Sequence, residues 1–324
     1  MRKLVFCTQR LDAEDPVLAA TVPMVRALAA RVDDLVVLCD TARSEVAGNV
    51  RVHEFGAPSQ LQRGARFEQA LARELRGCDG VVAHMVPLYA VLAAPLVRPR
   101  GIPLVLWYTH WKGHAVVRAA ERVCTAVASV DVRSFPLHSA KVNGIGHGID
   151  LAEFACTETP PGPPLRALVL GRYSPAKGLE VVLDAARRAG VEVEAHGSDA
   201  TYEGYRRELQ SRFPQATLAG PVPRAAIPGL FARHHVLINN MRAGAPDKVV
   251  YEAAASCLPV LASNPVFDDL LSEELRFARD DADELAEKLR TLDLRRRPEL
   301  REVVARRHSV EHWADGLLAT VSRR

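Results

Sequence analysis

Two cationic side chains flank a turn in the segment GRYSPAKG, residues 171–178. Gly171 follows an apolar run, and Arg172 and Lys177 lie five residues apart on either side of a Ser-Pro turn. Arginine offers a planar set of donors and lysine a mobile point charge, a combination suited to a diphosphate. Without a metal, such cations must stabilise the charge of a departing diphosphate. Taken alone, two cations beside a turn are more often solvated surface.

A second segment with possible chemistry is NMRAGAPDKVVYEAAASCLPVLAS, residues 240–263. Its small residues 242–246 predict a kinked turn, and helix-forming residues begin at Asp247, where an N-cap or first-turn acid belongs. A loop that leads into a helix N-terminus presents free N–H groups, which suits a diphosphate. Glu252 could accept two hydrogen bonds from a ribose diol. The spacing alone is more typical of an ordinary strand–helix unit with a solvated glutamate.

The elements that must position these segments alternate between apolar strands and amphipathic helices, which predicts α/β domains with parallel sheets. The predicted strands are 3–8, 35–39, 50–55, 80–85, 103–109 and 125–130, then 165–171, 191–197, 216–220, 235–239 and 259–262. The predicted helices start at Pro16, near 61–76, 87–96, 113–124, 179–189, 202–212 and 224–232, and at Asp247, with a helical tail over 282–292 and 299–321.

The length of 324 residues suits two domains of about 150 residues each. Residues 155–164 (ACTETPPGPP) predict a linker, because five of the ten are proline or glycine. We therefore expect one domain over residues 1–154 and a second over 165–305. Residues 306–324 form a separate helical tail.

The charge and the cysteines of the sequence limit the cellular compartments and the binding partners that the protein can have. The net charge of +3 is too small to indicate nucleic acid, although residues 1–150 hold 18 basic and 14 acidic side chains and suit an anionic acceptor or a membrane surface. Six dispersed cysteines predict free, buried thiols in a reducing compartment. No apolar run approaches the roughly 20 residues of a membrane span. We expect a cytoplasmic protein, with peripheral association at the inner membrane face left open.

The two chemical segments together resemble those of retaining glycosyltransferases of the GT-B fold, glycosyltransferase family 4. Residues 171–178 match the family's phosphate motif, and in residues 252–260 a Glu-Ala pair precedes small residues and a Leu-Pro-Val run, as in that family. The resemblance implies two doubly wound Rossmann-like α/β domains facing across a cleft, with the tail helix returning to the first domain. It also implies metal-independent transfer of a hexose, with retention, from a UDP- or GDP-linked donor to a glycan, lipid-linked or small-molecule acceptor.

The resemblance assigns roles to individual residues. Arg172 and Lys177 are expected to bind the diphosphate, Glu252 the ribose, Val222 the nucleobase, and His110 the sugar or acceptor in the cleft. Further contacts to the donor are expected from Gly171, Gly244, Asp247, Lys248 and Val249. A lone histidine such as His110 is more often a structural residue than a catalytic one.

Three departures from the family pattern bear on activity. Gly244 stands where many members have a first glutamate, eight residues before Glu252. Cys257 stands where a helix-ending glycine is usual, and a left-handed cysteine would cost about 1–2 kcal/mol. The loop after the first strand contains no glycine and offers polar residues, including Gln9 and Arg10. Either the first domain lacks the family's backbone contacts to the donor, or this is a distinct acceptor loop. Asp15 in that loop is expected to act as a cap.

Asp281 and Asp283 form an Asp-Ala-Asp sequence that binds a metal in other glycosyltransferases. Here it begins an amphipathic helix, where acids are expected in the first turn. We expect helix capping, no metal and no cofactor other than the donor.

Three alternatives remain open at this point. A nucleotide-sugar epimerase of the same fold would turn over the donor without an acceptor. A catalytically silent subunit would bind the donor without transfer, and the missing carboxylate at Gly244 makes this more than a formal alternative. A module at the membrane surface would use the arginine-rich residues 290–307, although a solvated helix face explains them better.

Overall fold

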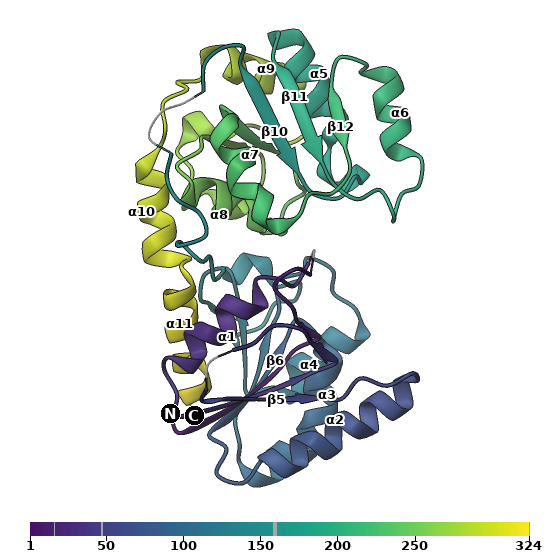
Figure 1. The fold of residues 1–324 in the computed structure, drawn as a ribbon, viewed down its shortest axis with the longest axis vertical. Helices are drawn as coiled ribbons and strands as arrows, with labels where there is room; N and C mark the ends of the chain where they lie inside the picture. Colours follow the sequence, from purple (N-terminus) through teal and green to yellow (C-terminus); the bar gives the residue numbers. More distant parts are fainter. Residues whose placement is uncertain (16, 47, 158–160, 324) are drawn as a thin grey trace. The chain divides into compact units, whose positions relative to one another are not determined.

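The structure is a computed structural model that describes residues 1–15, 17–46, 48–157 and 161–323. It divides the chain into two compact units, which Figure 1 draws in sequence colours. Unit 1 comprises Met1–Asp150 together with Arg307–Arg324, and unit 2 comprises Leu151–Arg306. The sequence predicts domain boundaries at residues 154 and 305, and the chain passes between the units after Asp150 and after Arg306.

Unit 1 is built on a seven-stranded sheet in the order β5-β3-β1-β6-β7-β8-β9, in which neighbouring strands are parallel. Most of its strands are buried throughout, as expected for a parallel sheet covered on both faces. The strands are β1 Lys3–Cys7, β3 Asp34–Cys39, β5 Val50–Glu54, β6 Gly80–His84, β7 Leu104–Trp107, β8 Ala126–Ser129 and β9 Val142–Gly144.

Helices cover both faces of this sheet, as Figure 1 shows. On one face lie α1 (Thr21–Ala29) and α11 (Val310–Ser322), and on the other lie α2 (Gln60–Glu74), α3 (Pro87–Val97) and α4 (Ala115–Val123). Side chains alternate along β1, so that Val5 and Cys7 join the core under α2, α3 and α4. The ring of Phe6 points the other way and meets the Trp313 ring of α11 at 6.4 Å.

The helix α11 completes the core of unit 1. Trp313 is fully buried, and its ring contacts Trp107 at 5.8 Å as well as Phe6. A Cβ atom on Gly80 would lie 2.2 Å from Val321, so α11 packs directly on β6. The tail predicted to be helical over 299–321 is helical but interrupted, because α10 (Pro298–Arg307) ends before α11 begins. Ser309 separates them by accepting the His312 N–H at 3.2 Å as an N-cap.

The first helix also begins later than the sequence predicts. Pro16 lies outside the described residues, and α1 starts at Thr21. Asp15 does act as a cap, since its Oδ1 accepts the N–H groups of Val17 at 2.9 Å and Leu18 at 2.7 Å. It therefore caps the turn that precedes α1 and not α1 itself.

Unit 2 contains a five-stranded parallel sheet in the order β12-β11-β10-β13-β14. Helix α5 packs against α9 on one side, and α8 packs against β13 and β14 (Figure 1). The strands are β10 Arg166–Leu170, β11 Glu192–His196, β12 Thr217–Ala219, β13 Val236–Asn239 and β14 Val260–Ala262. The helices are α5 Leu179–Ala189, α6 Tyr205–Arg212, α7 Ile227–Arg233, α8 Lys248–Ala255 and α9 Ala282–Thr291. The described residues include no helix long and apolar enough to cross a membrane.

A disulfide between Cys156 and Cys257 joins the chain before β10 to the end of α8. The prediction of six free cysteines is therefore wrong for this pair, and cysteine usage no longer argues for a reducing compartment. The two residues are 101 positions apart, and neither lies in a short Cys-x-x-Cys spacing that would reveal a pair. The other four cysteines are free.

Cys257 has a φ of 59°, so the left-handed conformation considered from the sequence is present. We expect Cys257→Gly to be more stable than Cys257→Ala by about 1 kcal/mol, because glycine adopts this conformation without steric cost. Both variants lack the disulfide, so their difference isolates the backbone effect. Urea unfolding of the two proteins measures it, and an equal or greater stability of the alanine variant would contradict a left-handed residue 257.

Candidate functional site

The loop after β10 carries the predicted phosphate motif. Gly171 follows the strand with a φ of 137°, a conformation that favours glycine. A Cβ atom on Gly171 would lie 2.7 Å from Lys177 Nζ. A Cβ atom on Gly197, after β11, would lie 1.9 Å from the Gly171 carbonyl oxygen. Glycine is therefore required at 171 by the backbone conformation and at 197 by the close approach of the loop to the end of β11.

Lys177 connects this loop to the start of α8. Its Nζ forms an ion pair with the Asp247 carboxylate, and Asn239 Nδ2 donates to the same carboxylate at 2.8 Å. The Lys177 and Asp247 side chains are 16% and 21% exposed, so the pair is partly shielded from water. The structure thus brings together the two segments that carry the sequence motifs. Asn239, at the end of β13, was not predicted to take part.

Asp247 occupies the N-cap position of α8, but its side chain accepts no hydrogen bond from the helix. The capping role that the sequence suggests for its side chain is wrong, because Lys177 and Asn239 hold the carboxylate instead. Within the described part of the chain, the N–H groups of Lys248 and Val249 have no hydrogen-bond partner. They remain available at the positive end of the helix.

The turn before α8 is stabilised by Asn264, a residue that follows β14. Gly244 has a φ of 79°, which a glutamate at this position could adopt only with strain. Asn264 Nδ2 donates to the carbonyl oxygens of Arg242 at 2.9 Å and Ala245 at 2.8 Å. Asn264 follows β14, and no motif in the sequence pointed to it.

Glu252, the predicted ribose ligand, is buried in unit 2 and held by an arginine that the motifs did not indicate. Arg224 Nη1 donates to Glu252 Oε1 at 2.9 Å, and Arg224 Nη2 donates to Glu153 Oε2 at 2.7 Å. The guanidinium also lies over the Phe154 ring at 5.4 Å. Glu252 is therefore not the solvated glutamate of an ordinary strand–helix unit. Its position is fixed by contacts within unit 2.

Lys248 lies half-buried in the first turn of α8. Burial lowers the pKa of Lys248 to about 8, the Glu252 carboxylate opposes this shift, and the Arg224 charge adds to it. A lysine with this pKa is partly neutral near pH 8 and becomes charged as an anion approaches.

We expect Lys248 to titrate near pH 8, below the ordinary lysine value of 10.5. Glu252→Gln should lower this midpoint further, because it removes a negative charge that favours the ammonium form. Reductive ¹³C-methylation followed by NMR titration measures the midpoint, with Lys248→Arg identifying the signal. If Lys248 titrated with the ordinary lysine pKa of 10.5, its side chain would not be buried as the structure shows.

The other residues of unit 2 that are predicted to contact the nucleotide sugar differ in how exposed their side chains are. Arg172 is exposed and forms no hydrogen bond or ion pair of its guanidinium within the described ranges. Val222 and Val249 are both half-buried. Val222 and Val249 therefore keep some surface that a ligand could contact.

His110 belongs to unit 1 and follows the end of β7, as the sequence predicts. Its Nδ1 accepts the Lys112 N–H at 3.0 Å, and its ring stacks on Trp111 with centroids 5.7 Å apart. These local contacts orient the imidazole. Its role toward a sugar or an acceptor stays a prediction.

The Asp-Ala-Asp sequence caps a helix, as predicted. Asp281 Oδ1 accepts the Glu284 N–H at 2.9 Å at the start of α9, and Asp283 pairs with Arg188 at 2.5 Å. Among the described residues, no group of three or more His, Cys, Asp or Glu side chains could hold a metal ion.

Solved structures of the same architecture span nearly the whole chain. A sucrose-phosphate synthase from Thermosynechococcus elongatus matches with a TM-score of 0.75 and 15% identity over 98% of both chains. A glycosyltransferase involved in avilamycin A biosynthesis matches with a TM-score of 0.73 and 16% identity, over 100% of this chain and 98% of that one. A UDP-GlcNAc 2-epimerase from Methanocaldococcus jannaschii matches with a TM-score of 0.60 and 8% identity, over 98% and 99%.

The fold is therefore GT-B, with two Rossmann-like α/β units, as the sequence predicts. Residues 177–319 match a family model described as glycosyl transferase-like. This match begins at Lys177 and includes all of α8. No protein of curated function matches the sequence.

Proposed function

We propose that the protein is a metal-independent, retaining glycosyltransferase that moves a sugar from a UDP- or GDP-linked donor to a glycan, lipid-linked or small-molecule acceptor. The contact between Lys177 and Asp247 supports the donor site most directly, because it brings a cation to the N-terminus of α8. A diphosphate there would meet the Lys177 ammonium and the available N–H groups of Lys248 and Val249. Retention is proposed from the family resemblance.

In this mechanism the positive charge for the leaving group comes from the chain itself. As the bond between sugar and diphosphate breaks, negative charge grows on the diphosphate oxygens. The Lys177 ammonium and the exposed Arg172 guanidinium stabilise that charge, and no metal is required. Asp247 holds Lys177 before the donor arrives, so the diphosphate must take over a cation that is already paired. Donor affinity therefore includes the cost of loosening this ion pair.

Glu252 is proposed to bind the ribose. Arg224 holds its Oε1 atom, which leaves Oε2 to accept hydrogen bonds from the diol. Because Arg224 also pairs with Glu153, the carboxylate is positioned before the nucleotide binds. His110 is proposed to orient the sugar or the acceptor.

Membrane association receives no support from the arginine-rich residues 290–307. Arg297 is nearly buried and pairs with Glu274, and Arg295 pairs with Asp293 and Glu299. Arg301 donates to backbone carbonyl oxygens within unit 2, including Leu151 at 3.1 Å. These side chains are committed to contacts within the protein and offer little free charge to a lipid surface.

Thermal shift with a panel of nucleoside diphosphates, without added metal, tests the donor site. A ligand at a hundred times its Kd stabilises by about 2.7 kcal/mol. We expect one nucleotide to stabilise the protein, Arg172→Ala to lose much of that shift, and Arg207→Ala, which removes an exposed arginine on α6, to keep it. A panel without any response, or a response unchanged in Arg172→Ala, would count against the site.

Turnover separates the proposed function from its two alternatives. A transferase releases nucleoside diphosphate from the donor and joins the sugar to an acceptor. The fold is shared with an epimerase, which would instead interconvert donor sugars without any acceptor. A silent subunit would show the thermal shift without either reaction. Product analysis by mass spectrometry, with the donor identified by thermal shift, distinguishes the three outcomes.

A further inference from the structure

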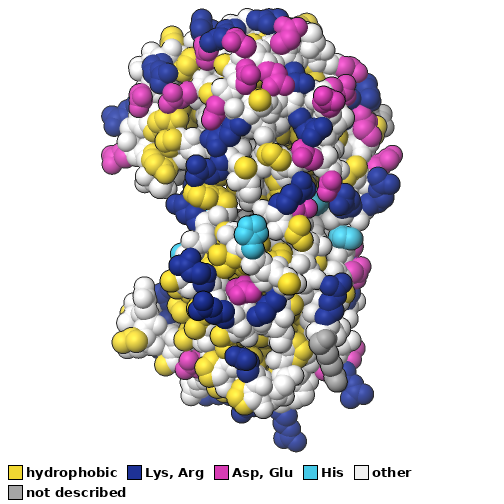
Figure 2. Space-filling model, turned by 180° about the vertical axis from the view of Figure 1, so that it is seen from behind, with side chains coloured by type: hydrophobic (Ala, Val, Ile, Leu, Met, Phe, Trp, Pro, Cys, Tyr) yellow, Lys and Arg dark blue, Asp and Glu magenta, His cyan; other side chains and the backbone are white. Residues whose placement is uncertain are grey.

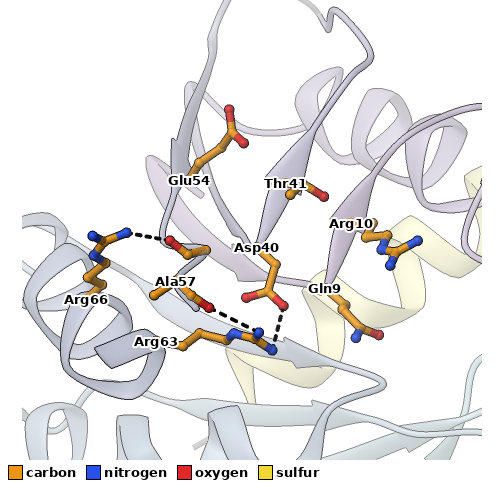
Figure 3. A pocket seen from close by; sticks show the side chains of 9 residues that line it. Gln9, Arg10, Asp40, Thr41, Glu54, Ala57, Arg63 and Arg66 are labelled. Atoms are coloured by element: carbon orange, nitrogen blue, oxygen red, sulfur yellow. Dashed lines mark hydrogen bonds and ion pairs between the residues drawn. The ribbon is translucent and has the colours of Figure 1, made fainter. Parts of the chain in front are cut away.

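A polar cavity of about 700 Å³ lies in unit 1, at the carboxyl ends of β1, β3 and β5. Figure 3 shows the side chains that line it, which come from the segment after β1, the end of β3, β5 and the chain after it, and α2. Ligands of open α/β sheets bind beyond the carboxyl ends of the strands. The volume falls within the range of small-molecule sites. Of its lining residues, only Gln9 and Arg10, in the loop after the first strand, were singled out from the sequence.

The walls of this cavity are held in place by backbone contacts. A short strand β2 (Arg10–Leu11) pairs in parallel with β4 (Thr41–Ala42), and Arg10 stands opposite Thr41 in the register. A Cβ atom on Gly56 would lie 2.5 Å from the Asp40 carbonyl oxygen, so the chain after β5 lies directly against the end of β3. The cavity is therefore formed by the fold before any ligand arrives.

Three guanidinium groups line the cavity, and they differ in whether a carboxylate pairs with them. Arg10 pairs with Asp15 at 2.8 Å, and Arg63 pairs with Asp40 at 3.3 Å. Arg66 donates only to the Gly56 carbonyl oxygen, at 2.5 Å, and forms no ion pair with any described residue. Arg63 and Arg66 lie one turn apart on α2, so a ligand at that wall meets two planar sets of donors.

The lining of the cavity also offers hydrogen-bond acceptors. Asp40 is half-buried, and burial raises the pKa of its carboxyl group while the Arg63 and Arg10 charges oppose the rise. Glu54 is among the residues that line the cavity and has no ion-pair partner within the described residues. Together with Gln9 and Thr41, these side chains suit a ligand with several hydroxyl groups. The lining has little apolar surface for a hydrophobic ligand.

The charge of unit 1 agrees with an anionic ligand. Unit 1 holds 21 Lys and Arg against 16 Asp and Glu, whereas unit 2 holds 21 against 23. Figure 2 shows basic side chains prevailing over one face of unit 1 and both signs interspersed over unit 2. Such an excess of positive charge favours the approach of anions.

We propose that this cavity binds the acceptor, and that the acceptor is a sugar bearing an anionic group, either a phosphate or a carboxylate. Arg66, with Arg63 beside it, holds the anionic group, and Asp40, Glu54 and Gln9 hold the hydroxyl groups. This assignment of the acceptor rests on the proposed transferase function. Binding of an anionic sugar to unit 1 does not depend on it.

Calorimetric titration with four probes tests the proposal: glucose 6-phosphate, glucuronate, glucose and inorganic phosphate. We expect at least one anionic sugar to bind about tenfold or more tightly than both glucose and inorganic phosphate, because charge and hydroxyl groups are recognised together. Arg66→Gln should weaken that binding about tenfold or more, which is the loss of a charge-assisted contact. Arg73→Gln removes an exposed arginine elsewhere on α2 and should leave the affinity unchanged.

Each other outcome overturns the proposal in a recognisable way. Equal affinity for inorganic phosphate and glucose 6-phosphate would indicate a simple anion site, and a preference for glucose would indicate a neutral ligand. Failure of all four probes to bind, or equal effects of Arg66→Gln and Arg73→Gln, would remove the cavity as the site. Thermal shift with nucleoside diphosphates on Arg66→Gln separates the two proposals. A nucleotide response with no binding of any anionic sugar leaves the donor site intact, and the reverse leaves the cavity intact.

Discussion

Lys177→Met is expected to lower the turnover number for sugar transfer by about 10²–10³-fold, the loss seen when one preorganised charge-stabilising donor is removed from an enzyme. Methionine keeps the length and apolar stem of the side chain but supplies no charge to the departing diphosphate. The effect should fall on turnover more than on the Michaelis constant, because the ammonium acts mainly where charge develops. Release of nucleoside diphosphate from the donor measures it.

A loss of stability could imitate this effect, and the structure offers a control. Removal of Lys177 leaves the partly shielded Asp247 carboxylate with Asn239 as its remaining side-chain partner. The single variant should therefore melt at a lower temperature, and Lys177→Met combined with Asp247→Asn should recover much of that loss. Turnover should stay low in the double variant. If restoring stability also restored turnover, Lys177 would be a structural residue.

Arg224→Met is expected to lower the free energy of unfolding of unit 2 by about 3 kcal/mol, because it removes the guanidinium that two partly shielded carboxylates share. Glu252 is only 5% exposed in its side chain and Glu153 26%, so solvent cannot replace the guanidinium fully. The packing of Arg224 over Phe154 would also be lost. Urea unfolding at pH 7 measures the change.

The double variant Arg224→Met with Glu252→Gln supplies the comparison. It removes one buried carboxylate together with the cation and should be more stable than Arg224→Met alone by about 1–2 kcal/mol, since neighbouring groups are not additive. A loss below about 0.5 kcal/mol in the single variant would place Arg224 among ordinary surface residues. Such a result would also argue against Arg224 positioning the Glu252 carboxylate before the nucleotide binds.

The features that could be predicted from sequence are those encoded locally. Alternating apolar strands and amphipathic helices predicted both parallel sheets, and the segments around Gly171 and Asp247 predicted a loop and a helix start that the structure places together. The helix cap at Asp281 followed from acids in a first turn. In each case a stretch of a dozen residues contains the physical cause.

The features that were missed depend on distant partners. Glu252 is held by Arg224, which also pairs with Glu153, and Asp247 is held by Lys177 and Asn239. The partners in these contacts are up to 71 residues apart in the chain. No periodicity or motif specifies which arginine will meet which carboxylate across a sheet. The break before α11 is different, because Ser309 is a good N-cap and could have been recognised.

The discontinuous make-up of unit 1 has a consequence for how the protein is made. Ribosomes complete Leu151–Arg306 before they add the residues of α11, so unit 2 has its full sequence while unit 1 still lacks a helix. Until Trp313 arrives, the Phe6 and Trp107 rings on that face of the sheet have no cover from α11. The nascent chain therefore carries an exposed apolar face throughout the synthesis of unit 2, a state that chaperones bind and that favours aggregation. The first domain to emerge is the last to finish folding.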